Sequence, residues 1–395
     1  MNLPRTGVLP DFSLVLGGPL YQLFLRTRMA RAPLDLLYRR MVGIPLVAWL
    51  PLLVLSMVEG RAAGGGVAVP FLHDVEAHTR YLIALPLLIL AELVVHLRLG
   101  RAVGQFLQRG IVPPEEQSRF GDIVGSVMRL RNSVSVEVIL FAFVYTGGHY
   151  IWQQGHALST ATWFASGTDS GLRLTWAGVW YVWISIPIFQ FILLRWYFRL
   201  ALWIRLLWQV SRLELRVFPT HPDRAGGLGF LGETAAAFAP ILVAQSALLA
   251  GMIAGRIFFH GANLLDFQAE IAATLVILVL LVLAPLLLFS GHLIAAQQQG
   301  IDEYGPLASR YVAEFDRKWI RGGAPEGEPL VGSADIQSLA DLVNSFDVIQ
   351  RMRAFPFSWD VVIQLVVTVA LPILPLLLTM FPFDELLVKL VQVLF

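Results

Sequence analysis

The feature that most constrains this chain is a series of long apolar runs. Each approaches or exceeds the roughly 20 residues that a helix needs to cross about 30 Å of hydrocarbon. Composition agrees, since 56% of the 395 residues are hydrophobic and 14% are charged, against about 45–50% and about 25% in soluble domains. The sequence predicts an all-α fold, a polytopic helical bundle with about seven transmembrane helices and helical cytoplasmic extensions. The seven predicted spans are 41–58, 80–98, 135–153, 174–194, 235–256, 271–294 and 361–380.

Composition also excludes several kinds of site. The chain has no cysteine, so disulfides, thiolate metal sites, iron–sulfur clusters and cysteine nucleophiles are excluded. Its net charge of +1 gives no overall field that would attract nucleic acid. No cofactor motif in a suitable context is present, and no cofactor is predicted.

The basic residues alternate strictly between the predicted connecting segments. Four segments carry six basic residues each, 24 of the 29 in the chain: the N-terminal segment and those after the second, fourth and sixth spans. Cytoplasmic loops of membrane proteins carry the excess of Lys and Arg. We therefore expect a cytoplasmic N-terminus and an outer C-terminus. The preference for Arg over Lys is typical of a bacterial protein, which predicts the inner (plasma) membrane.

The predicted spans divide the chain into six parts. A cleavable signal peptide is not expected, because Gly17, Gly18 and Pro19 interrupt the first apolar run and the arginines follow it; an interfacial or re-entrant segment is expected instead. The predicted parts are an N-terminal segment (1–40), spans one to four with a helical loop near 99–134 (41–194), a basic extension and turn (195–234), spans five and six (235–294), a cytoplasmic helical segment (295–360), and span seven with an amphipathic tail (361–395).

The fourth span is expected to continue as a basic surface helix. A helical pattern runs from Trp176 to Val217 with only Pro187 as a break, and at 1.5 Å per residue it would be about 60 Å long. Five arginines fall within an arc of about 140° at 100° per residue. We expect this face to meet anionic lipid headgroups, or alternatively to line a vestibule that attracts anions. The five are Arg195, Arg199, Arg205, Arg212 and Arg216.

An amphipathic helix is predicted over residues 333–353. Apolar residues from Ile336 to Ile349 recur at helical spacing, Ser333 suits the N-cap, and Arg351 and Arg353 suit the last turn. It is expected to dock on the cytoplasmic end of the bundle or to form a subunit contact.

A few polar residues fall inside or at the ends of the predicted spans. Glu92 is the deepest, and His96 lies one turn further on the same face. An ionisable group at that depth marks a functional site by default, so we expect a polar path with Glu92 and His96 as cation or proton ligands. The alternative is a buried pair that holds helices together. The path candidates are Glu92, His96, Glu137, Gln245 and His292.

Histidines on the predicted outer side suggest a weak metal or proton-sensing site. The candidates are His73, His78, His149 and His156. Asp74 and Glu76 could complete a set of oxygen and nitrogen ligands. The alternative is that they are ordinary interfacial histidines.

The turn Thr220–Phe230 contains the start of a glycine motif, Gly227-x-Gly229-x-x-Gly232, whose last glycine lies two residues after the turn. A dinucleotide site would require a strand before this motif and an acidic residue about 20 positions after it, but a predicted span follows instead. We therefore expect a structural hinge, or a cytoplasmic gate or ligand site. Its polar candidates are His221, Asp223 and Arg224.

Small residues at four-residue spacing on the fifth span, Ala247, Gly251 and Gly255, allow close helix packing. The packing is expected within the chain or at a dimer seam.

Three functions are compatible with these features. The first hypothesis is a channel or transporter for ions or small solutes. The second is a membrane enzyme that acts on a lipid near His221, Asp223, Arg224 and His292, although no nucleophile or metal motif supports it. The third is a scaffold or sensor whose cytoplasmic helices bind a partner. The predicted partners are the lipid bilayer and anionic headgroups, with a second copy of the chain as a further candidate and no nucleic acid.

Overall fold

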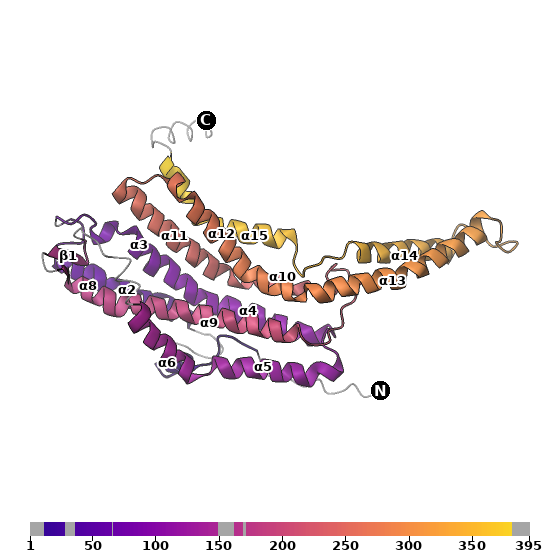
Figure 1. Cartoon of the computed structure of the whole chain (residues 1–395), viewed down its shortest axis with the longest axis horizontal. Coiled ribbons are helices and arrows are strands. Elements are labelled where there is room, and N and C mark those ends of the chain that lie inside the picture. The colour runs from indigo at the N-terminus through magenta and orange to yellow at the C-terminus, as the bar shows by residue number, and fades with distance from the viewer. Residues whose placement is uncertain (1–11, 28–35, 65, 149–161, 169–170, 381–395) are drawn as a thin grey trace.

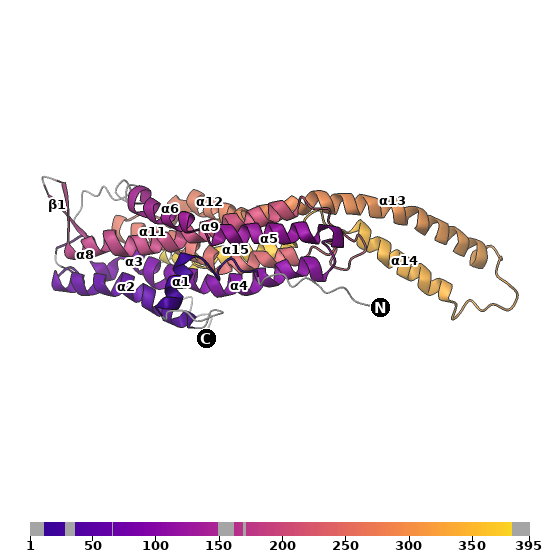
Figure 2. The same cartoon turned by 90° about the horizontal axis from the view of Figure 1, so that it is seen from below.

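The computed structural model describes residues 12–27, 36–64, 66–148, 162–168 and 171–380. Long helices lie side by side along the molecule, and one helical hairpin projects from the end of the bundle (Figures 1 and 2). The only sheet in the described part of the chain is an antiparallel hairpin in which Ala165 lies opposite Leu174. The predicted all-α class is confirmed.

The regular elements in chain order are α1 (Pro19–Arg26), α2 (Leu37–Val58), α3 (Val75–His78), α4 (Leu85–Gln108), α5 (Gln117–Arg131), α6 (Val134–Phe143), β1 (Ala165–Thr168), β2 (Gly171–Leu174), α8 (Trp176–Trp180), α9 (Ile186–Val210), α10 (Phe230–Ala235), α11 (Ala239–His260), α12 (Gln268–Leu283), α13 (Ser290–Phe315), α14 (Ala334–Gln350) and α15 (Trp359–Ala370). Tighter 3₁₀ segments are η1 (Phe71–His73), η3 (Pro114–Glu116), η6 (Ala236–Phe238), η7 (Leu264–Phe267), η8 (Ala284–Phe289) and η10 (Leu374–Met380). Wider π-helical segments are η2 (Thr79–Ala84), η4 (Val144–Gly148), η5 (Tyr181–Ser185) and η9 (Asp316–Ile320).

Within the described residues, five helical runs are long and apolar enough to cross a membrane. A sixth is present if α15 and η10, which are bent by 53° relative to each other, form one span. These six correspond to six of the seven predicted spans. The predicted span 135–153 is described only as the shorter apolar helix Val134–Gly148, and its remainder lies outside the described residues. The five runs are Leu37–Val58, Val75–Gln108, Trp176–Val210, Phe230–His260 and Leu264–Ile320.

The last of these runs extends well beyond any membrane thickness. It has 57 residues, which corresponds to about 86 Å of helix. Its second half packs against α14 and forms the projecting hairpin of Figure 1. The predicted amphipathic helix over 333–353 is thereby confirmed as α14. Ser333 caps it by accepting a hydrogen bond from the Asp335 N–H at 3.1 Å.

The basic surface helix was predicted wrongly in two respects. The helix ends at Val210 rather than Val217, because the following backbone pairs elsewhere: the Arg216 N–H donates to the Ile111 carbonyl at 2.8 Å. Arg195 and Arg199 are buried inside the bundle. Only the predicted residues Arg205, Arg212 and Arg216 are exposed.

The core is centred on α4, which packs against α2, α9 and α11. Leu85, Leu88 and Phe106 on α4 are completely buried, and they lie at intervals that keep one broad face of the helix toward its neighbours. Because α4 is surrounded, any polar side chain on its buried faces must find a partner on an adjacent helix.

The small-residue face of α11 packs within the chain. A Cβ added at Gly251 would lie 2.9 Å from Cβ and Oγ1 of Thr79, in η2, whereas a Cβ at Gly255 would meet nothing within 4 Å. Gly251 therefore permits the close approach of α11 to η2, and Gly255 does not serve that contact.

We expect Gly251→Ala to lower the thermal unfolding temperature in detergent. Gly255→Ala should leave that temperature unchanged or raise it, because Ala is about 1 kcal/mol more favourable than Gly inside a helix. The two substitutions differ only in what the added methyl group meets. Equal melting temperatures for the two variants would contradict the assigned packing.

Candidate functional site

A buried ion cluster joins three helices at Glu92. This residue lies on α4 and is 7% exposed. One of its carboxylate oxygens, Oε1, accepts hydrogen bonds from both Nη atoms of Arg199 on α9 at 3.1 Å. The other, Oε2, accepts from Nη1 of Arg40 on α2. Both oxygens of Glu92 are therefore engaged by guanidinium groups.

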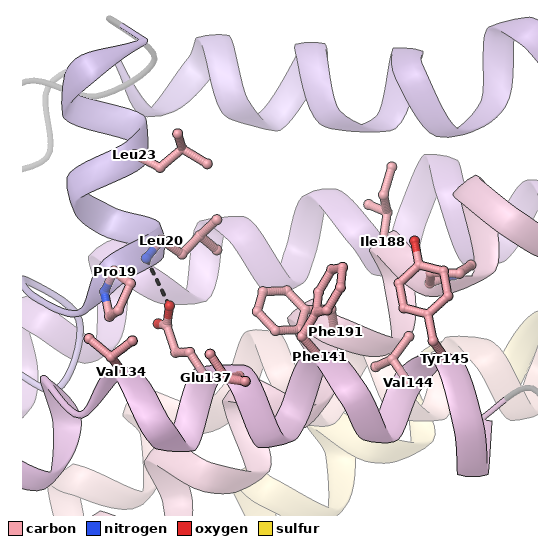
Figure 3. Close-up of a pocket in the computed structure, with 12 residues that line it drawn as sticks. Pro19, Leu20, Leu23, Val134, Glu137, Phe141, Val144, Tyr145, Ile188 and Phe191 are labelled. Atoms are coloured by element: carbon pink, nitrogen blue, oxygen red, sulfur yellow. Dashed lines mark hydrogen bonds between the residues drawn. The ribbon is translucent and has the colours of Figure 1, made fainter.

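A second ion pair lies one helical turn away on α9. Arg195 Nη2 lies 3.1 Å from Glu137 Oε1 on α6, and the other oxygen of Glu137 accepts the Leu20 N–H at 2.8 Å (Figure 3). This N–H belongs to the first turn of α1, where helical donors lack partners within the helix. Because Arg195 and Arg199 are four residues apart, one face of α9 presents both guanidinium groups.

Residues 12–18 are packed against this cluster. Arg131 donates a hydrogen bond to the Ser13 carbonyl, and Ser13 Oγ lies 2.9 Å from His96 Nδ1. The Gly18 N–H donates to Asn132 Oδ1 at 3.0 Å, and its φ of 86° favours glycine. Residues 12–18 thus bridge α4 and α5.

The cluster holds more positive than negative charge. The arginines buried in the described part of the chain are Arg40, Arg131, Arg195 and Arg199. Two carboxylates, Glu92 and Glu137, face them. Nε and Nη2 of Arg40 are buried and have no hydrogen-bond partner among the described residues.

A small cavity lies between the arginines. Its volume is about 10 Å³, close to the minimum that accommodates one water-sized particle. Aromatic rings cover the cations nearby: Trp196 lies 4.7 Å from the Arg199 guanidinium carbon, and Phe24 lies 5.3 Å from that of Arg40. The cavity is lined by Leu20, Phe24, Arg40, Ile44, Ile89, Glu92, Ile192, Arg195 and Arg199.

An apolar groove lies beside the cluster, between α1, α6 and α9 (Figure 3). Its volume is about 450 Å³. Phe141 and Phe191 line its walls, and Glu137 is its one charged lining residue. Glu137 therefore stands between the groove and Arg195.

The five predicted path residues do not form one line. Glu92 and Glu137 are brought into the same cluster, whereas His96 contacts Ser13. Gln245 lines a separate cavity of about 20 Å³ beside Tyr197. His292 Nε2 lies 2.9 Å from the Ser211 carbonyl oxygen and joins α13 to the end of α9.

The outer-side candidates for a metal site have other partners. His78 Nδ1 accepts a hydrogen bond from Trp49 Nε1 at 2.9 Å, and Asp74 accepts from Trp163 Nε1 at 2.7 Å. Glu76 forms an ion pair with Arg80. Across the described residues, including His73, no group of three or more His, Asp or Glu side chains could hold a metal ion. His149 and His156 lie outside the described residues.

The turn with the glycine motif is organised around Asp223. Its carboxylate accepts the backbone N–H groups of Ala225, Gly227 and Gly229 at 2.8, 3.1 and 2.9 Å, and His221 Nδ1 lies 2.8 Å from it. Gly227 has a φ of 93°, which favours glycine. The glycines thus allow the backbone to wrap around one carboxylate.

Neighbouring segments are held by the same turn. Arg353 donates two hydrogen bonds to the turn: its backbone N–H to the Arg224 carbonyl, and its Nη2 to the Asp223 carbonyl at 2.8 Å. The Arg224 side chain is exposed. Arg109 Nη1 donates to the Gly227 carbonyl at 3.2 Å. The turn therefore connects the ends of α4 and α14.

The sequence does not indicate the roles of Arg40, Arg131, Ser13 and Asn132. The two arginines count among the basic residues of the predicted cytoplasmic segments, and the partner that the sequence suggests for Glu92 is His96. One signal was available: a carboxylate inside an apolar span requires a cation, and Arg40 and Arg199 both lie near the ends of predicted spans.

Comparisons with protein-family models, with curated proteins and with solved structures found no match for this chain.

We expect Asp223→Asn to destabilise the protein by about 1–3 kcal/mol, because a half-buried carboxylate that accepts three backbone N–H groups loses its charge. Burial raises the pKa of the Asp223 carboxyl, but the three backbone N–H donors and His221 outweigh this effect, and the net pKa lies below its ordinary value. The stabilisation should therefore be complete above pH about 4 and disappear as the pH falls through the lowered pKa.

Melting temperatures of wild type and variant, measured between pH 3 and 8 in detergent, check this prediction. Asp122→Asn, on an exposed position of α5, is the matched control and should have little effect. A constant difference between wild type and Asp223→Asn down to pH 3 would contradict the assignment.

Proposed function

We propose that this chain is an integral membrane channel or transporter for ions or small solutes, and that the cluster around Glu92 is part of its solute path. The observation that carries the proposal is the burial of Glu92 with Arg40, Arg195 and Arg199 among helices long enough to cross a membrane. Charged groups inside such bundles are rare and mark solute paths, proton relays or gates.

Energetics support a functional rather than a purely structural cluster. Taking an ion pair out of water costs several kcal/mol per ion, and apolar residues of similar volume often stabilise a core as well or better. A cluster with surplus positive charge is less favourable still. Such an arrangement is retained where the charges act on something else.

Helix geometry near the cluster favours a structure that rearranges. The run that carries Glu92 contains the π-helical segment η2, and the run that carries Arg195 and Arg199 contains η5. The two segments contact each other through Arg80 Nη1, which donates to the Tyr181 hydroxyl at 2.6 Å. π-helical turns occur frequently at functional sites, and they provide places where spans can change their winding.

The proposed orientation places the N-terminus in the cytoplasm and the C-terminus outside, in the plasma membrane. Arg40 belongs to the first turn of α2, so the cluster lies toward the cytoplasmic end of the apolar layer. The exposed Arg205, Arg212 and Arg216 then face anionic headgroups. A homo-oligomer is compatible with this arrangement.

The lipid-enzyme alternative has less support. His221 and Asp223 are bonded to each other within the turn, and His292 contacts the Ser211 carbonyl. These side chains serve as connectors of backbone segments, and no observation favours a reaction at them. The scaffold alternative draws support from the projecting hairpin, where Val312 on α13 and Val343 on α14 are exposed.

Purified protein in liposomes should carry a measurable flux of at least one small ion. The measurement is the initial rate for K⁺, Na⁺, H⁺ and Cl⁻ under imposed gradients. Glu92→Gln should reduce that rate about tenfold or more, because it leaves Arg40 and Arg199 without their shared counter-ion in a buried site.

Arg205→Gln, on the exposed side of the same α9 helix, is the control and should retain the wild-type rate. No flux of any ion by folded wild-type protein would overturn the proposed function. A wild-type rate in Glu92→Gln would keep transport but remove the cluster from the path.

A further inference from the structure

We infer that the cavity between Arg40, Arg195 and Arg199 binds a small monovalent anion of about the size of chloride. The inference deepens the proposed function, on which it rests, by naming the chemical class of the bound solute. It depends on three independent observations: the charge balance of the cluster, the free donors of Arg40 and the dimensions of the cavity.

The charge balance leaves one positive charge over at the cavity. Three arginines and Glu92 line it, and Glu137 neutralises Arg195 from the side. Arg199 and Arg40 share the single carboxylate of Glu92. Among the described residues, three positive and two negative charges give a net charge of +1, which one monovalent anion would neutralise. Arg131, which donates to the Ser13 carbonyl, adds further positive potential.

Arg40 supplies the unused hydrogen-bond donors. Its side chain is 1% exposed and reaches Glu92 with Nη1 only. Nε and Nη2 are buried and have no partner in the described part of the chain. A guanidinium carries five N–H donors and no acceptor, so these unused groups can be satisfied only by an acceptor. Leaving such charged donors unpaired inside a protein costs more than leaving neutral ones.

The dimensions select a small anion. The cavity of about 10 Å³ is at the lower limit for holding one water-sized particle, which leaves no room for sulfate, phosphate or carboxylic acids with a chain. A fatty acid or acidic lipid in the neighbouring apolar groove is disfavoured as well. The charged residue that lines that groove is Glu137, whose carboxylate would repel an acidic headgroup.

The test is an equilibrium titration of purified protein in detergent. Chloride replaces gluconate at constant ionic strength, and the thermal unfolding temperature is recorded at each step. Since a ligand that binds only the folded state stabilises it by mass action, we expect a saturating rise of about 2 °C or more. Bromide should substitute for chloride, and sulfate should not.

Arg40→Met is the decisive variant. It leaves Glu92 paired with Arg199 and Glu137 paired with Arg195, so the charges counted at the cavity balance and the protein should remain folded in gluconate. Its unfolding temperature should no longer respond to chloride. Arg40→Lys keeps the charge and should retain a response with a half-saturation concentration raised severalfold, because Lys lacks the planar fork of donors. Arg205→Met is the matched control and should titrate like wild type.

Two results would overturn the inference. One is that wild-type protein unfolds at the same temperature in chloride and in gluconate. This result does not depend on the folding of any variant. The other is an unchanged chloride response in Arg40→Met. Failure of the proposed function can be distinguished from failure of this inference, because the titration involves no gradient. Saturable chloride binding without any ion flux would support the anion site and contradict transport. Ion flux without chloride-dependent stabilisation would support transport and contradict the anion site.

Discussion

The interaction on which the structure depends is the contact of one carboxylate with two guanidinium groups from different helices. Glu92 on α4 engages Arg40 on α2 and Arg199 on α9. An apolar helix face can slide along its neighbour at modest cost, whereas a buried charge has only one acceptable position. The contact therefore sets the positions of α2, α4 and α9 along their axes relative to one another. The adjacent Arg195–Glu137 pair extends the same constraint to α6, and through the Leu20 N–H to α1.

The cluster also explains why the N-terminal segment lies within the protein. Ser13 is buried and contacts both Arg131 and His96, so residues before α1 complete the polar environment behind the arginines. A short irregular segment between apolar helices is tolerated only where its backbone groups find partners. Arg131 and Asn132 provide such partners for the Ser13 carbonyl and the Gly18 N–H.

Much of the fold follows from the sequence, but the site does not. Apolar run length predicted six of the helical runs, and capping at Ser333 predicted α14. The helical periodicity predicted that Arg212 and Arg216 lie on the helix. This prediction is wrong, because the helix ends at Val210 and the Arg216 N–H donates to the distant Ile111 carbonyl. The partners of Glu92 are 52 and 107 residues away, and no local pattern indicates such a distance. Asp223 was singled out as a polar residue, yet its three N–H donors depend on a turn geometry that spacing alone does not determine.

The continuous run Leu264–Ile320 has a mechanical consequence. From Ser290 to Ile320 it continues as an arm of about 46 Å, which contains Pro306 and the π-helical segment η9. Hydrogen bonds from Gln297 Nε2 to the Ile349 and Met352 carbonyls join the base of this arm to the end of α14 and the residues after it. A tilt of about 10° where it leaves the bundle would sweep its tip through about 8 Å. The 3₁₀ segment η8, which contains Pro285, directly precedes the arm. A small change in the angle between the arm and the packed helices would therefore become a large displacement at the tip of the arm.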